Sequence, residues 1–261
     1  RVGSLNLGNI LAADSCSFAA SGTITLAQKT LTVCPMKVNL ELCEKDYETL
    51  YLSQDQRPGS NVDGNLPKSF NDFLINLVAD RVSQQTEVIA WAGDVSGSPV
   101  TLCDGIIVQV AADATRVSVS ATGAGYISNV TYVVAEIAKI YNAIPFALDR
   151  SKVKIFVSPA AHSAYLQGLA VAFPALITYV NGAYAAKYMD VEVVRAPGMP
   201  TNKAIAADPE NLWYATDLVS DESELNIISM KGTTGDPTVR MITEFKIGFG
   251  YGVGAEIVYY S

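Results

Sequence analysis

The sequence predicts a mixed α+β fold, because helical and strand patterns are interspersed along the chain. Apolar residues recur at helical spacing from Phe70 to Val82. They alternate at strand spacing from Met36 to Leu42 and from Met241 to Ile247. A chain of 261 residues can bury a substantial core. We find no internal repeat and no Gly/Ser-rich linker in the sequence, so separate domains on a string are not expected.

The N-terminal region is predicted to be extended. Residues 1–22 are rich in Ala, Ser, Asn and Gly and lack both periods, which is typical of an arm that becomes ordered on a neighbouring molecule. From Thr23 the alternation predicts a ribbon of strands, which is followed by a polar loop over 53–65. Because a two-stranded ribbon is marginal alone, we expect its partner on an adjacent molecule.

Three helices are predicted after the ribbon. Ser69 is in position to cap the first, and a Pro after Ser158 opens the third directly after a strand at 153–157. The predicted helix limits are Pro67 to Gly93, Gly125 to Pro145, and a start at Ser158. Further strands are predicted at Ile106–Val110, Arg116–Ser120, Val191–Val194, Leu225–Met230 and Val239–Phe249.

The composition excludes several classes of function. Hydrophobic residues make up 49% of the chain and charged residues only 17%, below the roughly 25% of an ordinary soluble domain. Much of the surface is therefore expected to be interface. The net charge of -8 disfavours direct binding of a phosphate backbone. The longest apolar stretch, 169–180, contains Pro174 and is shorter than the about 20 residues of a membrane helix.

The cysteines do not form a metal motif. Cys16, Cys34, Cys43 and Cys103 contain no CxxC pair, and His162 is the single histidine. A Cys34–Cys43 disulfide is geometrically conceivable, but reduced packing thiols are the preferred interpretation for a chain assembled inside a cell. No zinc site is predicted.

One motif is similar to a catalytic signature. Gly93–Pro99 reads GDVSGSP, similar to the GDSGGP around the nucleophile of chymotrypsin-like proteases. Val95 breaks that spacing, and His162 lies downstream of Ser96 instead of upstream. A turn after a helix is the preferred interpretation, with His162 structural. A serine hydrolase using Ser96 and His162 is kept as a distant alternative.

Two other segments lack the features of ligand sites. The Gly-rich turn 121–126 has neither a dinucleotide fingerprint nor a phosphate loop, and the acidic run 221–224 lacks the periodicity of a calcium loop. We therefore predict no catalytic, cofactor-binding or metal-binding residue and no cofactor. Aromatic residues suited to subunit contacts or to the core are Trp91, Tyr179, Tyr184, Tyr188, Trp213, Tyr214, Tyr251, Tyr259 and Tyr260.

Three segments, taken in order, are the most informative part of the chain. They are the ribbon TITLAQKTLTVCPMKVNLEL with the helix LPKSFNDFLINLVADRV, the helix-strand-turn-helix region 129–166, and the strands from VEVVRAPGMP to IGFGYG. Their succession resembles the major capsid proteins of tailed double-stranded DNA bacteriophages, which have the HK-ninety-seven-type fold. The resemblance covers nearly the whole chain and lies in the order of the segments.

The resemblance implies a division of the chain into five parts. They are an N-terminal arm (1–22), an extended ribbon loop (23–65), a spine helix with the peripheral domain (66–145), an axial domain (146–220) and return strands (221–261). Many members of the family lose an N-terminal scaffolding segment to a maturation protease, and Arg1 would then be the first residue of the mature form. The alternative is that Arg1 marks an artificial chain boundary. Lys29, Lys37 and Lys45 lie in or near the ribbon, but none matches a crosslinking motif.

The implied function is structural and not enzymatic. Many copies, arranged as pentamers and hexamers, would form an icosahedral virion head in the bacterial host cytoplasm. The shell would enclose the packaged DNA without sequence-specific binding and would contact portal and decoration proteins, but no membrane. The alternative is an encapsulin-type nanocompartment shell, which resembles the same fold. A jelly-roll capsid is disfavoured by the long amphipathic helices.

Overall fold

The computed structural model describes residues 2–7, 24–43, 68–97, 101–172, 179–180, 183–184, 186–217, 226–232, 234–236 and 238–261. The chain divides into two compact units. Unit 1 comprises Arg1–Thr32, Ile89–Tyr214 and Phe249–Ser261, and unit 2 comprises Val33–Val88 and Ala215–Gly248. The boundaries fall inside helix α2 (Lys68–Ala92) and inside strands β11 (Leu212–Thr216) and β13 (Thr238–Tyr251).

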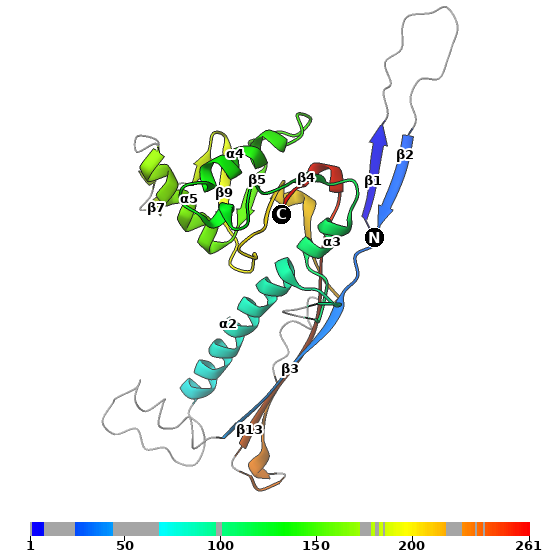
Figure 1. Cartoon of the computed structure of the whole chain (residues 1–261). Helices are drawn as coiled ribbons and strands as arrows, with labels where there is room; N and C mark the ends of the chain where they lie inside the picture. The colour runs from blue at the N-terminus through cyan, green and yellow to red at the C-terminus, as the bar shows by residue number, and fades with distance from the viewer. Residues whose placement is uncertain are drawn as a thin grey trace, which may run out of the picture. The chain divides into compact units, whose positions relative to one another are not determined.

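Unit 1 is built on a six-stranded mixed sheet (Figure 1). The strand order is β4 (Val117–Val119), β14 (Val258–Tyr260), β10 (Ala204–Ala207), β5 (Lys154–Val157), β9 (Val191–Arg195) and β8 (Lys187–Tyr188). The β4/β14 and β5/β9 pairs are parallel, and the other neighbours are antiparallel. The strand that is last in sequence therefore lies inside the sheet.

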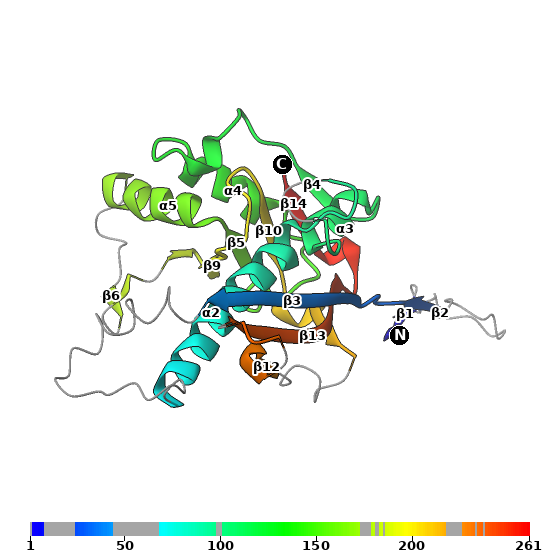
Figure 2. The ribbon, with the colours of Figure 1, turned by 90° about the horizontal axis from the view of Figure 1, so that it is seen from below.

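Helices α4 (Val133–Ala143) and α5 (Pro159–Ala172) cover one face of this sheet (Figure 2). The main core lies between them, and its members include Ile137, Ile140, Ile155, Val157, Ala161, Tyr165, Val191 and Val193. The start of α5 follows from the local sequence. The Ser158 hydroxyl accepts a hydrogen bond of 3.2 Å from the Ala161 N–H, as the predicted N-cap requires.

Short elements complete unit 1. They are α3 (Ile106–Ala112), the 3-10 helices η1 (Tyr126–Ser128), η3 (Pro209–Asn211) and η6 (Gly254–Glu256), and the strand pair β6 (Tyr179–Val180) and β7 (Ala183–Tyr184). Unit 1 also contains an antiparallel ribbon of β1 (Val2–Leu7) and β2 (Ile24–Lys29), in which Val2 pairs with Lys29 and Leu7 with Ile24.

Unit 2 is centred on a long antiparallel pair of strands. Strand β3 (Cys34–Cys43) pairs with β13 over its whole length, and the two lie side by side in Figure 2. On the other side of β13 lies β12 (Asn226–Ser229), which is followed by η5 (Met230–Gly232). One face of the pair packs against α2 through Met241 and Val78. The alternation of β3 is therefore that of a strand with one buried face.

The structure corrects several predictions. Residues 106–110 are helical instead of forming a strand, and their buried side chains, Ile106, Ile107 and Val110, have helical spacing. Residues 2–7 form a strand where no regular structure was predicted. The predicted ribbon strands exist as β2 and β3, but they pair with β1 and β13 of the same chain.

Two helix starts also differ from the prediction. Ser69 lies inside α2, which begins at Lys68. The second helix is replaced at its start by η1, and α4 begins at Val133. The asparagine before it explains the delay, because the Asn129 side chain accepts a hydrogen bond of 2.9 Å from the Thr131 N–H and so closes a turn.

Candidate functional site

The protease-like segment forms a turn. The Ser96 N–H donates to a carboxylate oxygen of Asp94 at 2.8 Å, and the Val95 N–H donates to Asp104 at the same distance. His162 lies half-buried in α5, where burial and then the charge of Arg195 lower its pKa. Among the described residues, no hydrogen bond joins Ser96 to His162. The geometry favours the structural interpretation of both.

The turn at 121–126 leads into η1 through Gly125, whose φ of 74° favours glycine. The acidic run 221–224 lies outside the described residues. Across the described ranges, no group of three or more His, Cys, Asp or Glu is arranged to hold a metal ion. No described helix combines the length and apolarity needed to cross a membrane.

The cysteines differ from the expectation of reduced packing thiols. Cys34 and Cys103 are disulfide-bonded, whereas Cys43 is a free, half-buried thiol. A Cys34–Cys43 disulfide is therefore excluded. Cys16 lies outside the described residues.

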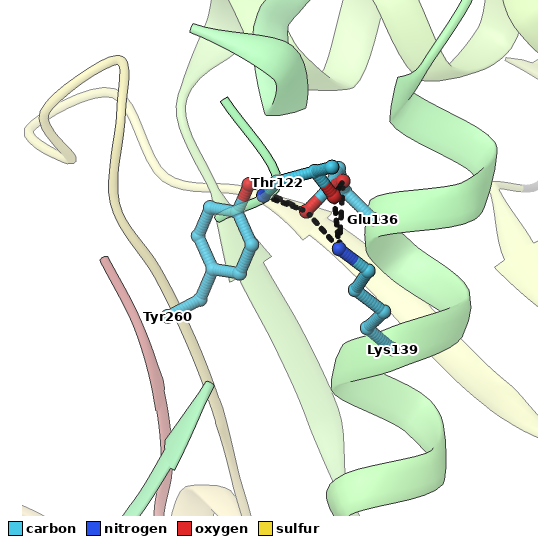
Figure 3. A network of polar contacts seen from close by, with 4 residues as sticks. All are labelled: Thr122, Glu136, Lys139 and Tyr260. Carbon is cyan, nitrogen blue, oxygen red and sulfur yellow. Dashed lines mark hydrogen bonds and ion pairs between the residues drawn. The ribbon is translucent and has the colours of Figure 1, made fainter. Parts of the chain in front are cut away.

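A buried carboxylate forms the centre of a polar network in unit 1 (Figure 3). Glu136 in α4 is only 1% exposed. It accepts hydrogen bonds from the Tyr260 hydroxyl at 2.9 Å, from the Thr122 hydroxyl, and from Lys139, whose Nζ lies 3.1 Å away. The network thus joins α4, the turn before η1 and the last strand of the sheet. A buried charge without such partners would be costly.

The pKa values in this network follow from its contacts. Burial raises the pKa of Glu136, but the hydrogen bonds from Thr122, Tyr260 and Lys139 outweigh burial, and the pKa lies below its usual value. Burial and then the hydrogen bond to Glu136 raise the pKa of Tyr260. Glu136 is therefore charged at neutral pH, and its charge is balanced by donors from three parts of unit 1.

Glu136 was not predicted as a buried charge, although the sequence contains a signal for it. In α4 the apolar residues Val133 and Ile140 are buried, and Glu136 lies three residues after the first and four before the second. It therefore occupies the buried face of the helix. A single carboxylate on an apolar stripe indicates a satisfied internal charge.

A second polar cluster holds the residues after the β1–β2 ribbon. The Lys29 ammonium lies 3.1 Å from the centre of the Tyr251 ring, and the Tyr251 hydroxyl donates to Asp113 at 2.7 Å. Burial lowers the pKa of Lys29, which the charge of Asp113 opposes. Leu31 lies so close to Gly250 that a Cβ there would be 2.5 Å from Leu31 Cδ1. The root of the ribbon is thereby fixed to the rest of unit 1.

Large apolar side chains are exposed on unit 1. Phe146 is 93% exposed, Val171 80% and Met189 75%. Met189 has a φ of 55°, an uncommon conformation for a residue other than Gly, Asn or Asp. Beside Phe146, the Arg150 guanidinium lies 5.4 Å from its ring and 4.7 Å from that of Tyr141. Such side chains are suited to contacts with another molecule.

Cross-strand ion pairs line the face of the β3/β13 pair that is opposite Met241. Lys37 contacts Glu244 at 2.8 Å, and Glu41 contacts Arg240 at 2.9 Å. All four side chains are at least about half exposed, so solvent screens both pairs and each contributes little to stability within the chain. Lys29 and Lys37 thus have partners within their own chain, and Lys45 lies outside the described residues.

The aromatic residues for which the sequence left core and interface open are divided between buried and exposed positions. Trp91, Tyr251, Tyr259 and Tyr260 are buried, whereas Tyr214 is 55% exposed. Tyr188 and Trp213 are half-buried, and the side chains of Tyr179 and Tyr184 are not described. These rings therefore supply the core more than the surface.

Comparisons with known proteins identify the fold. No family model and no curated protein sequence matches the chain. Its structure matches the capsid of an empty GTA particle with a TM-score of 0.60 at 14% identity, over 99% of this chain and 83% of that chain. It matches a chain of Gordonia phage Cozz with a TM-score of 0.60 at 13% identity, over 99% and 80%.

The structure also matches a chain of the satellite phage P4 procapsid, a particle that includes the size determination (Sid) protein. The TM-score is 0.56 at 14% identity, over 100% of this chain and 90% of that chain. These similarities span 99–100% of this chain and 80–90% of the matched chains, and they show that the fold is the mixed α+β, HK-ninety-seven-type fold of phage capsid structures. The fold class predicted from the sequence is confirmed at this level.

Proposed function

We propose that this chain is the major capsid subunit of a tailed phage or a GTA-like particle. In this proposal, many copies assemble into an icosahedral shell that encloses packaged double-stranded DNA. The observation that carries the proposal is the fold match over 99% of the chain to a capsid structure.

The surface supports association as the function. Phe146, Val171 and Met189 present large apolar side chains to solvent, and the charged fraction is only 17%. A protein that stays monomeric has little reason to keep such surfaces, whereas contacts between subunits cover them. The net charge of -8 is suited to a shell whose lining does not adhere to packaged DNA.

The finer assignments are part of the same proposal. We assign α5 with strands β5, β8, β9 and β10 to the axial domain, α2 to the spine helix, and strands β2 and β3 to the ribbon loop. The division at residues 22, 65, 145 and 220 stays a prediction, as do contacts with portal and decoration proteins and the location in the virion head.

Sedimentation velocity with absorbance at 260 and 280 nm tests the proposal. A megadalton particle that absorbs like nucleic acid supports the phage-type shell. An empty or protein-filled particle would instead support the nanocompartment alternative. A species that stays at the chain mass of 27.8 kDa at high concentration would contradict both shell functions.

A further inference from the structure

Strand β3 has one edge that no described strand covers. In the part of the chain that the structure describes, β3 pairs only with β13. The other edge presents main-chain N–H and C=O groups along a strand of ten residues. An edge of this length is a template for a further strand.

Pro35 indicates which residues point to that edge. Pro35 pairs with Lys246 in the ladder, and proline fits a sheet where its missing N–H faces away from the partner strand. Main-chain groups of alternate residues point to the same side of an antiparallel strand. The N–H and C=O groups of Lys37, Asn39 and Glu41 therefore also point to the open edge.

The charges on this segment are arranged so that they would be complementary to those of a second copy related by a two-fold axis. Lys37, Asn39 and Glu41 lie on one face of the sheet, with a positive charge two residues before Asn39 and a negative charge two residues after it. The Lys37 side chain is 51% exposed and that of Glu41 is 53% exposed. A second β3, antiparallel and centred on Asn39, would place Lys37 opposite the partner's Glu41 at both ends.

Other pairings of the same strands are disfavoured. A parallel pair in register would place Lys37 on the partner's Lys37, and like charges directly opposite each other destabilise a sheet. A shift of two residues in the antiparallel register removes both ion pairs. The centred register also brings Val38 against the partner's Leu40 on the apolar face, where Leu40 is left 38% exposed in the single chain.

We propose that β3 pairs with β3 of a second copy of this chain about a two-fold axis at Asn39. The contact joins two sheets edge to edge through main-chain hydrogen bonds, and the pairs formed by Lys37 and Glu41 set its direction and register. This inference rests on the proposed function, since a shell requires contacts between copies. It adds the strand and the register of one such contact.

Variants with exchanged charges distinguish this contact between two copies from the ion pairs within one chain. Variant A carries Lys37→Glu with Glu244→Lys, and variant B carries Glu41→Arg with Arg240→Glu. Each keeps an ion pair inside its own chain, but A places carboxylates at both positions 37 and 41, and B places cations at both. Two copies of A, or two of B, then meet with like charges across the axis.

Neither variant alone is expected to assemble into particles. Assembly is expected to recover in two cases. Because A and B are complementary to each other, a mixture of the two is expected to form particles. The chain with all four substitutions is expected to assemble like the unmodified chain. Normal particle formation by A alone and by B alone would overturn the proposal.

A crosslink tests proximity directly. Residues of a hydrogen-bonded antiparallel pair have Cα atoms about 5.5 Å apart, within the range of a disulfide. In a Cys43→Ser background, Asn39→Cys is expected to give covalent dimers on oxidation, seen on a non-reducing gel. The matched control, Asn226→Cys on the exposed strand β12 of the same sheet, is expected to stay monomeric on that gel.

The outcomes distinguish this contact from the shell itself. Particles that form normally without a crosslink at position 39 would overturn the contact and leave the capsid function standing. A crosslink at position 39 in a protein that forms no megadalton particle would support the contact while contradicting the capsid function. A crosslink at position 226 as strong as that at 39 would indicate random collision and would overturn the contact.

Discussion

The Tyr260 hydroxyl donates a hydrogen bond of 2.9 Å to Glu136 and so links the last strand of the six-stranded sheet to helix α4. Both residues are at most 1% exposed. Thr122 and Lys139 complete the shell of donors around the carboxylate. The charge therefore has a structural role, which can be tested apart from assembly.

Replacement of Glu136 by Gln is expected to lower the free energy of unfolding by about 2 kcal/mol, because charge-assisted hydrogen bonds are lost and Lys139 loses its partner. Tryptophan fluorescence during urea unfolding of unassembled chains measures the change. The control is Glu192→Gln, which breaks the exposed ion pair with Lys154 and is expected to cost less than about 1 kcal/mol. Equal losses in the two variants would contradict a special role for Glu136.

The stability difference between the unmodified chain and Glu136→Gln is also expected to depend on pH. The pKa of Glu136 is lower in the folded chain than in the unfolded chain, where a Glu titrates near about 4.3. The stabilisation by its charge is therefore complete above that pH and is lost as the pH falls through the folded pKa. The stability difference between the unmodified chain and Glu136→Gln is expected to be constant from about pH 7 to pH 5 and to shrink below about pH 4. A difference that grows in acid would contradict the direction of the shift.

Gly168 marks a close approach of α5 to the start of α4. A Cβ at this position would lie 2.9 Å from the Val130 carbonyl oxygen and 3.2 Å from a methyl group of Val133. Gly168→Val is therefore expected to destabilise the chain by about 1–3 kcal/mol through overpacking. At Gly232 a Cβ meets nothing within 4 Å, so Gly232→Val serves as the control, expected within about 0.5 kcal/mol. Urea midpoints measure both, and a neutral Gly168→Val would contradict the packing argument.

Asn211 ties η3 to the turn after β13. Its side-chain oxygen accepts hydrogen bonds from Gly252 and Val253 at 3.0 and 2.8 Å, and its amide donates to the Val253 carbonyl at 2.9 Å. Asn211→Ala leaves the Val253 N–H without this acceptor and is expected to cost about 1–3 kcal/mol. Asn202→Ala, at an exposed position, is the control. Faster amide hydrogen exchange at Val253 in Asn211→Ala alone would locate the effect.

Local signals in the sequence were sufficient for several elements. Ser158 followed by Pro159 fixed the start of α5, because a cap and a first-turn proline act on neighbouring residues only. The alternation from Met36 to Leu42 identified β3 for the same reason. In contrast, the apolar run at 106–110 is compatible with a helix or a strand, although Ile and Val favour strands. The helix forms because its buried side chains have helical spacing in the fold.

Long-range pairing could not be predicted from these signals. Cys34 pairs with Ile247, and Val2 pairs with Lys29. Alternation of apolar residues identifies the buried face of a strand, but it does not identify the strand with which it pairs. The candidate site was also only partly predictable. The burial of Glu136 was detectable from its helical spacing to Val133 and Ile140, whereas its donors Thr122 and Tyr260 come together only in the folded chain.

The interior position of β14 determines when unit 1 can be finished during translation. β14 lies between β4 and β10, so both must wait for residues 258–260 to leave the ribosome. At about 5–20 residues added per second, β4 waits on the order of ten seconds for its neighbour. A nascent chain stalled before Val258 would leave one main-chain edge of each of these strands unpaired, and such an edge can pair with a strand of another chain.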